Sequence, residues 1–389
     1  MTEAAVVVDV VRTTSGRARP SGRHAGVHPV DLLAVTLEHL LERNPFERHE
    51  IDDVVAGCVT QAGEQSANLA RHAVLAAGLP ESVPAMTVDR QCGSSQQAVH
   101  LAAQAVMSGS ADIVVACGVE SMSRAPMLSN VGDADRYGTR LARRYPDGLV
   151  GQGISAELVT SRYGLARREL DEFATRSHRR AAVAWSRAAV DVVPVDGVPP
   201  GPDETVRPDT SVESLSALRP AFRDEAMAAR FPQIGWQVTA GNSSPLTDGA
   251  SAALIMSATR AASLGLNPRA RIRTMAVVGD DPTLMLMGVV PATRRALERA
   301  GLSASDVDLY EVNEAFACVP LAWQRDVGVE DDRLNVDGGA IALGHPLGAS
   351  GTRILGTLLR ALEDRDATLG LMTMCEAGGM ANATVLERL

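Results

Sequence analysis

The sequence predicts an α/β fold with buried sheets, built from two similar halves. Short apolar, β-branched runs alternate along the chain with longer segments in which apolar residues recur at helical spacing, and such alternation is typical of α/β proteins. Three stretches near the start resemble, in the same order, three stretches about 250 residues further on. Three matches in order indicate a duplication. A chain of 389 residues, 46% hydrophobic and 22% charged, is long enough to bury the core of such a fold.

The predicted elements follow in order along the chain. The predicted strands are residues 6–11, 54–59, 86–88, 113–117, 253–256, 272–278, 309–312, 334–336, 371–375 and 383–386. The predicted helices are residues 31–42, 94–107, 167–187, 292–300 and 351–362. The three repeated pairs begin at residues 51 and 307, 86 and 334, and 113 and 371, so the halves cover roughly residues 1–120 and 250–389.

The middle of the chain differs from both halves. Residues 188–223 are rich in Pro, Gly, Asp and Ser and show little periodicity. Residues 136–187 hold eleven arginines against five acidic residues. Three interpretations remain open for this basic stretch: a solvated helical face, attraction for a polyanionic ligand, or a contact between subunits.

Composition excludes several classes of function. The chain contains no lysine, and its 37 basic residues are all arginine, which excludes Schiff-base chemistry, pyridoxal phosphate and a Walker-A phosphate lysine. A net charge of −10 disfavours nucleic-acid binding. No apolar run reaches the ~18–20 residues of a membrane span, and no signal segment precedes the first strand. Five widely spaced cysteines predict reduced thiols in the cytoplasm, and no spacing indicates a metal site.

Cys92 is the first candidate for chemistry. It stands between the strand at 86–88 and a mostly apolar helix that begins at Ser94. Free N–H groups and partial positive charge at a helix N-terminus favour a thiolate, so the position predicts a lowered thiol pKa and a nucleophile. The alternative is an inert buried cysteine.

A glycine-rich stretch at 335–351 contains one histidine, His345, followed by Pro346. The glycines also suggest a dinucleotide-binding turn, but their spacing does not match Gly-x-Gly-x-x-Gly. A positioned imidazole fits the stretch better. Upstream, a strand ends in Asn313-Glu314, which suits either a helix cap or a pair that holds a water or a histidine. Near the C-terminus, Cys375 ends a strand before a glycine pair. The repeat therefore predicts that two thiols and His345 meet between the halves.

At these four motifs the sequence resembles the thiolase family, the acetyl-CoA C-acyltransferases. The matching motifs are Cys92-Gly93-Ser94, Asn313-Glu314-Ala315-Phe316, the segment 338–346, the Cys375 turn, and Thr239-Ala240-Gly241-Asn242. The resemblance covers essentially the whole chain. It implies two halves stacked as α-β-α-β-α layers, with residues 1–120 and 245–269 as the N-terminal half, 121–244 as an inserted loop domain that binds CoA, and 270–389 as the C-terminal half.

The resemblance also implies the activity and the site residues. A 3-oxoacyl-CoA is cleaved by CoA into acetyl-CoA and a shortened acyl-CoA, or the reverse Claisen condensation takes place, in fatty acid or other lipid metabolism. Cys92 carries the acyl group, and His345 activates the Cys92 thiol. Asn313 positions a water that binds the oxyanion, and Cys375 moves a proton at the α-carbon of acetyl-CoA. The backbone N–H groups of Cys92 and Ala377 form a second oxyanion site.

By local alignment, Arg207, Ser214, Ser244 and Phe316 contact CoA. The family further implies CoA as a substrate with no permanently bound cofactor and no metal, and a homodimer or homotetramer.

Three departures from the family pattern bear on these expectations. The C-terminal motif usually reads Cys-x-Gly-Gly, whereas Ala377 stands at the first glycine, and alanine disfavours positive φ. This leaves open a thiolase-fold binding subunit with little activity. The segment 151–153 lacks the histidine of strictly acetoacetyl-CoA-directed members, which favours another or longer acyl group. Residues 223–237 are longer than usual, and their Phe231 and Trp236 either reshape the pocket or pack at the surface.

Overall fold

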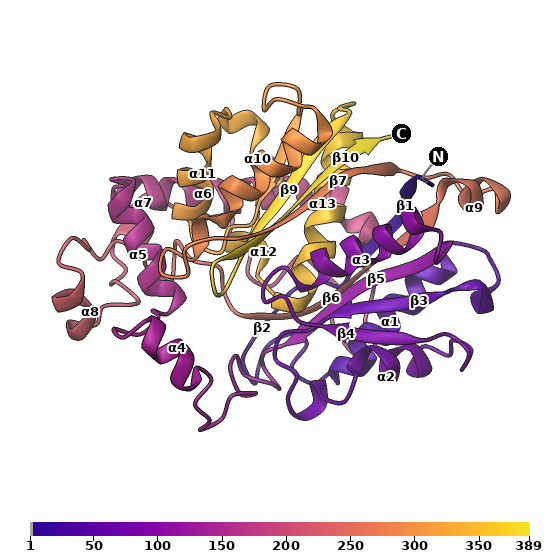
Figure 1. Cartoon of the computed structure of the whole chain (residues 1–389), viewed down its shortest axis with the longest axis horizontal. Helices are drawn as coiled ribbons and strands as arrows, with labels where there is room; N and C mark the ends of the chain where they lie inside the picture. The colour runs from indigo at the N-terminus through magenta and orange to yellow at the C-terminus, as the bar shows by residue number, and fades with distance from the viewer. Residues whose placement is uncertain (1–2) are drawn as a thin grey trace.

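The computed structural model describes residues 3–389, whose strands form a mixed sheet covered by helices (Figure 1). Neighbouring strands follow the order β4-β3-β5-β6-β1-β7-β10-β9-β8, and β2 pairs with β6. The strands are β1 (Ala5–Arg12), β2 (Gly16–Arg17), β3 (Asp53–Gly57), β4 (Ala85–Val88), β5 (Ile113–Ser121), β6 (Thr247–Ser257), β7 (Ala270–Gly279), β8 (Leu309–Val312), β9 (Leu369–Glu376) and β10 (Met380–Arg388).

The helices are α1 (Pro29–Glu42), α2 (Leu69–Ala76), α3 (Ser94–Ser108), α4 (Gly138–Arg144), α5 (Gln152–Arg162), α6 (Arg167–Ala188), α7 (Val212–Ser216), α8 (Glu225–Arg230), α9 (Ala258–Ser263), α10 (Val289–Ala300), α11 (Cys318–Val327), α12 (Ala340–Leu343) and α13 (Ser350–Asp364). Their ends follow local chemistry: α1 carries Pro29 in its first turn, and α3 and α10 end at Gly109 and Gly301, both at positive φ.

The sheet consists of two halves with the same pairing pattern. In the first half, β3 pairs in parallel with β4 and β5, and β5 pairs antiparallel with β6. In the second half, β8 pairs in parallel with β9, and β9 pairs antiparallel with β10. The halves join where β1 and β7 share two residue pairs. The duplication predicted from the sequence is therefore confirmed at the level of strand pairing.

Helices α3 and α13 form the central layer between the two halves of the sheet (Figure 1). Side chains alternate along β5: Val114 and Ala116 face the cluster around α3, whereas Ile113, Val115 and Cys117 face α1 and α2. On the other half, α10 and α11 pack against the outer face of β8, β9 and β10. Both faces of the strands are thus buried, and the layers alternate as helix, strand, helix, strand, helix, as expected.

One predicted strand is wrong. Residues 334–336 form no strand and share only one parallel bridge with β8, from Leu334 to Tyr310. The reason is local, because Asn335 adopts a φ of 45°, outside the β region. Its side chain instead donates to the carbonyl of Val312 (2.9 Å) and accepts from the Val312 N–H (2.8 Å). A side-chain bridge to β8 therefore replaces strand pairing here.

The other predicted strands are present, with β5 and β6 longer than expected, and the five predicted helices are present. Helices α2, α5 and α11 were not predicted. In α5 every residue from Gly153 to Thr160 is buried, so the helix has no polar stripe by which its period could be recognised. Helix α11 carries Pro320 in its first turn.

Residues 122–246 are inserted between β5 and β6 and contain α4 to α8. Helices α4, α5, α7 and α8 project to the left in Figure 1, whereas α6 packs against α12. The two strands are antiparallel neighbours, and Ser121 at the end of β5 lies opposite Asp248 near the start of β6. Because the ends of the insertion meet, a long segment can leave and rejoin the sheet without disturbing it. The assignment of 121–244 as a separate CoA-binding domain stays a prediction.

No helix within residues 3–389 has both the length and the apolar composition needed to cross a bilayer.

Candidate active site

Cys92 lies in the tight turn that joins β4 to α3. The turn is held by the Gln91 N–H, which donates to Asp89 Oδ1 (2.7 Å), and by the Gly93 N–H, which donates to the Arg90 carbonyl (3.1 Å). Gln91 has a φ of 49°, so the chain reverses immediately before the cysteine. Cys92 is buried directly before the first turn of α3, as the sequence predicts.

The expected lowering of the Cys92 pKa is wrong. Burial and, to a lesser extent, the nearby Glu376 raise the pKa of this thiol to about 12, against the opposing effect of a hydrogen bond with the Gln152 side chain. The apolar central layer therefore outweighs the helix N-terminus. Cys92 rests as a thiol near neutral pH and needs a base to become a nucleophile.

His345 has the geometry of that base. Gly344, at a φ of 85°, turns the chain from α12, and the His345 N–H donates to the Pro245 carbonyl (3.3 Å). The Ser350 hydroxyl donates to the Pro346 carbonyl (2.8 Å), so toward the imidazole it can only accept. His345 Nδ1, 2.7 Å from Ser350 Oγ, must therefore carry the proton. The Nε2 atom then carries the lone pair, and its neighbour in the structure is the Asn313 Nδ2, 3.4 Å away.

Burial and the charge of Arg353 lower the pKa of His345 to about 3. The imidazole is accordingly neutral at physiological pH. A neutral imidazole is the resting state that a general base requires. The same lowering of its pKa weakens it as a base, so the transfer of the Cys92 proton needs a change in the surroundings of the site when substrate binds.

Asn313 directly follows β8 and extends its pairing, because its N–H donates to the Thr373 carbonyl of β9 (3.0 Å). Its Nδ2 lies 3.4 Å from His345 Nε2. Its Oδ1 is buried and has no hydrogen-bond partner among the described residues. Of the two interpretations of the Asn-Glu pair, a cap of the next helix along the chain is wrong, because the N-cap of α11 is Ala317. Glu314 does accept from a first-turn N–H of the distant helix α12, that of Ile341 (3.1 Å). Asn313 instead faces the histidine.

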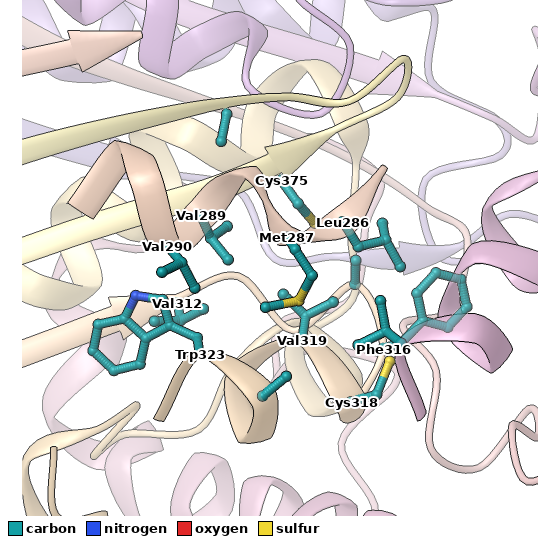
Figure 2. Close-up of a cluster of buried hydrophobic side chains, with 14 of the residues drawn as sticks. Leu286, Met287, Val289, Val290, Val312, Phe316, Cys318, Val319, Trp323 and Cys375 are labelled. Atoms are coloured by element: carbon teal, nitrogen blue, oxygen red, sulfur yellow. The ribbon is translucent and has the colours of Figure 1, made fainter. Parts of the chain in front are cut away.

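Cys375 is the penultimate residue of β9 and is fully buried. Burial raises its pKa well above the ordinary value, and Cys92, Cys318 and Glu376 raise it further. Figure 2 shows Cys375 beside Leu286 and Met287 in the apolar cluster that also contains Cys318 and Phe316. Cys92 is near enough to raise the pKa of Cys375. The two thiols are therefore neighbours, as the repeat predicts.

The turn after Cys375 resolves the question raised by Ala377. Positive φ falls on Gly378 (87°) and Gly379 (79°), whereas Ala377 has no positive φ. Alanine is therefore compatible with the backbone at this position. The positive φ angles of the turn fall one and two residues later, on glycines, and the oxyanion role of the Ala377 N–H stays a prediction.

Glycines of the segment 335–351 make close backbone contacts that bring the halves together. A Cβ on Gly351 would lie 2.0 Å from the Gln96 backbone nitrogen, and one on Gly348 2.6 Å from the Gly57 carbonyl oxygen. In addition, the Thr352 N–H donates to Ser95 Oγ (3.1 Å). Helix α13, which begins five residues after His345, is thereby held against the Cys92 end of α3. These glycines serve contacts within the protein, which argues against a dinucleotide turn.

Two buried glutamates that brace the site were not recognised as such from the sequence. Glu120 accepts hydrogen bonds from the N–H groups of Val59, Thr60 and Gly348 (2.9–3.0 Å). Glu314 accepts from Ser177 Oγ (2.6 Å) and from groups of the glycine-rich segment. A glutamate inside or at the end of an apolar strand is the signal that marks both, because a buried carboxylate needs several donors.

The four predicted CoA-contacting residues fall into two groups. Ser244 and Phe316 lie on adjoining segments beside the site, since Ser244 donates to the Ala315 carbonyl (3.0 Å) and the next segment, at Leu246, bridges to His345. Arg207 and Ser214 lie on the exposed surface of the insertion. The Ser214 hydroxyl donates to the Ser211 carbonyl at the start of α7 (2.8 Å).

Aromatic residues of the insertion occupy two places. Phe222 stacks edge-to-face on Phe316 with ring centres 5.8 Å apart, and a Cβ on Gly153 would lie 2.2 Å from the Phe222 ring. Phe222 was not singled out from the sequence. Phe231 and Trp236 pack with Val150, Ile154, Leu158 and Ile234 in a cluster that Phe222 also joins. The cluster therefore adjoins the Phe222–Phe316 ring pair, and both interpretations of these two aromatic residues stay open.

The duplicated five-layer fold, with two buried thiols, a neutral histidine and an asparagine at the junction of its halves, defines a protein of the thiolase class. The family model described as "Thiolase, N-terminal domain" matches residues 5–259, and the one described as "Thiolase, C-terminal domain" matches residues 266–388. The chain belongs to the thiolase family.

Individual relatives are similar over their full lengths. The chain is 46% identical over 400 residues to a 3-ketoacyl-CoA thiolase of Salmonella typhimurium, covering 100% of both chains. It is 45% identical over 397 residues to the 3-ketoacyl-CoA thiolase of Aeromonas hydrophila, covering 99% of each. Among solved structures, the acetyl-CoA acetyltransferase of Bacillus anthracis aligns with a TM-score of 0.88 at 34% identity, over 100% of this chain and 99% of that one.

Proposed function

We propose that this protein is an acyltransferase that cleaves a 3-oxoacyl-CoA with CoA, giving acetyl-CoA and a shortened acyl-CoA, or that runs the reverse Claisen condensation. The observation that carries the proposal is the buried, neutral imidazole of His345, with its Nε2 beside Asn313, in a fold that also buries the Cys92 and Cys375 thiols. The names of the relatives, 3-ketoacyl-CoA thiolase and acetyl-CoA acetyltransferase, support the same chemistry.

In the first half-reaction, His345 Nε2 takes the proton of Cys92 as the sulfur attacks the C3 carbonyl carbon of the substrate. The C2–C3 bond then breaks, and its electron pair stays on C2 as the enolate of acetyl-CoA. Cys375 gives its proton to C2, acetyl-CoA leaves, and the remaining acyl group is a thioester of Cys92. Splitting one difficult cleavage into two steps lowers each barrier.

In the second half-reaction, the Cys375 thiolate takes the proton of the incoming CoA thiol. The CoA sulfur attacks the acyl carbon, and the Cys92 sulfur leaves and recovers the proton from His345. Each thiol and the imidazole thus return to their starting protonation states. The high thiol pKa values suit this cycle, because both cysteines hold their protons until a partner takes them.

Charge that develops on oxygen needs preorganised donors. Once His345 has taken a proton, its Nε2–H becomes a donor, and Asn313 beside it holds a water as a second one. The unpaired Oδ1 of Asn313 suits such a water. The N–H groups of Cys92 and Ala377 form the second oxyanion site.

The remaining expectations complete the proposal. CoA is a substrate that Arg207, Ser214, Ser244 and Phe316 contact, no cofactor is permanently bound, and the enzyme acts in fatty acid or other lipid metabolism. The protein is a homodimer or homotetramer in the cytoplasm, a compartment that suits its five free thiols.

The test measures thiolysis of a panel of 3-oxoacyl-CoAs, from acetoacetyl to long and ring-bearing chains, together with the mass of the acylated protein. We expect Cys92→Ala to abolish both turnover and the acyl adduct, and Cys375→Ala to reduce turnover at least 100-fold. Cys117→Ala, a buried thiol on the far side of β5, is the control and keeps activity. Turnover by Cys92→Ala, or no acyl-enzyme with any substrate, would contradict the proposal.

A further inference from the structure

Glu376 is the residue after Cys375 at the end of β9, and its side chain lies against the first residues of the α3 segment. It is fully buried. A Cβ on Gly93 would lie 1.9 Å from Glu376 Oε1, so the carboxyl group occupies the space that any larger residue at Gly93 would need. The carboxyl is therefore seated beside the residue that follows Cys92.

Neither oxygen of this carboxyl has a hydrogen-bond partner among residues 3–389. Two charged groups of the β4–α3 turn, Asp89 and Arg90, are near enough to influence it. Arg90 forms no ion pair with it within the described chain, and the Arg90 guanidinium lies 4.0 Å from Met380 Sδ on β10. Glu120 and Glu314 are buried too, yet each accepts several hydrogen bonds. Glu376 is thus a buried acid placed where only its neutral form is well accommodated.

The protonation of Glu376 matters to both thiols. Burial raises the pKa of Glu376 to about 8, with Arg90 lowering it and Asp89 raising it. In turn, an ionised Glu376 raises the pKa of Cys92 and that of Cys375. A negative carboxylate at this place therefore opposes each thiolate that the proposed cycle forms.

We propose that Glu376 is a positioning residue that works as the protonated acid: while it holds its proton, Cys92 and Cys375 can form thiolates, and the loss of this proton sets the upper pH limit of the enzyme. The groups that face it are Asp89, Arg90 and Cys92 from the β4–α3 turn and Cys375 from its own strand. The proposal rests on the roles of Cys92 and Cys375 proposed above.

The first experiment measures the rate of Cys92 alkylation by iodoacetamide from pH 6.5 to 9.5, in the wild type and in Glu376→Gln. The amide keeps the shape of the side chain and cannot ionise. We expect the ratio of the variant rate to the wild-type rate to rise at least fivefold between the two pH values, because only the wild type gains a charge beside the thiol. A purely structural role would give a constant ratio, which would overturn the proposal.

The second experiment substitutes the charged neighbours of Glu376 and measures how kcat/KM depends on pH. Asp89→Asn removes a charge that holds the proton on Glu376, so the alkaline fall in kcat/KM should move to lower pH. Arg90→Gln should move it to higher pH. In the Glu376→Gln background this fall should be absent, and neither substitution should shift any pH dependence that remains. Shifts of the same sign, or equal shifts in the Glu376→Gln background, would overturn the proposal.

The two proposals fail separately. If Cys92→Ala still turns over 3-oxoacyl-CoA, the proposed function itself fails. If Cys92→Ala is inactive and the alkylation ratio is independent of pH, only the role of Glu376 fails. Thermal unfolding at pH 6.5 shows that Glu376→Gln is folded before either measurement.

Discussion

Hydrogen bonds around one imidazole decide the chemistry at the scale of the residue. The Ser350 hydroxyl commits its proton to the Pro346 carbonyl and thereby assigns the His345 proton to Nδ1. Without this assignment, burial alone would leave the tautomer open, and Nε2 could carry the proton instead of the lone pair. The serine therefore acts through the histidine and touches no substrate.

Replacing Ser350 with alanine leaves Nδ1–H of His345 buried without an acceptor. We expect kcat to fall roughly 10- to 100-fold, corresponding to about 1–3 kcal/mol, with little change in KM, because the substrate is not contacted. Steady-state kinetics of thiolysis checks this. Thr357→Ala, farther along the same helix, is the matched control. A change confined to KM would show that Ser350 acts in binding instead.

Glu376 also gives a stability signature. Burial raises its pKa in the folded state to about 8, from the ordinary value of 4.5 that it keeps in the unfolded chain. The folded protein therefore holds a proton that the unfolded chain releases, and stability falls as the pH rises from about 4.5 to 8. Between pH 6 and 9 the free energy of unfolding should fall by roughly 2–3 kcal/mol more in the wild type than in Glu376→Gln. Urea unfolding at the two pH values measures the difference, and parallel losses in both proteins would contradict it.

At the scale of the element, the approach of α13 to α3 fixes the distance between His345 and Cys92. The approach is possible because Gly351 has no side chain where it meets the Gln96 backbone. Contacts between backbones of two helices leave no flexible side chain to absorb a misfit. The precision of the site is therefore built into the central layer rather than into its loops.

Gly351→Ala should accordingly destabilise the protein by roughly 3 kcal/mol and lower turnover as well. Gly109→Ala, at the other end of α3, is the comparison: its φ of 73° costs about 1 kcal/mol, but nothing lies within 4 Å of the added Cβ. The free energy of unfolding in denaturant and kcat are measured for both variants. Equal losses of stability with intact turnover in both variants would show that the helix contact does not position the site.

Elements also show how far a sequence pattern can be taken. The buried strands could be predicted because burial on both faces leaves a continuous apolar, β-branched run in the sequence. Helix α10 could be predicted because one polar face gives its sequence a helical period. The prediction at 334–336 failed although its pattern resembled a strand, because a left-handed Asn335 ends the extended backbone. Helix α5 was missed for the opposite reason, since it is buried nearly all round.

At the scale of the whole molecule, the insertion is tied to the core by a buried ion pair. Arg12 at the end of β1 donates two hydrogen bonds to Asp203, at 2.7 and 2.9 Å. Asp203 also accepts from the Ser15 N–H (2.7 Å). Burial opposes the charge of Asp203, but Arg12 and these hydrogen bonds hold its pKa below the ordinary value. The carboxylate is thus ionised and anchors residues far from β1 in the sequence.

Asp203→Ala leaves the Arg12 charge buried without its partner. We expect a loss of about 3–5 kcal/mol in the free energy of unfolding. Glu172→Ala removes the exposed pair with Arg168 and should leave stability essentially unchanged, because surface pairs are screened by solvent. Chemical denaturation compares the two variants, and similar small effects would show that this pair does not anchor the insertion.

The sequence by itself determined the architecture and the identity of the candidate groups. Hydrophobic periodicity and the repeat are local properties, and they place Cys92, Asn313, His345 and Cys375 at the ends of strands or in turns before helices. The same motifs were sufficient to recognise the family. The periodicity, the repeat and the motifs can be recognised without knowledge of the packing, because each depends only on residues that are close along the chain.

Only the tertiary structure decided how these groups behave. The Cys92 thiol was expected to be acidic from its helix terminus, but burial and Glu376, more than 280 residues away, raise its pKa. The tautomer of His345, the unpaired carboxyl of Glu376 and the backbone geometry at Ala377 likewise could not be derived from local pattern. Desolvation, hydrogen bonding and charge act through space, so protonation states follow from which distant segments the fold brings together.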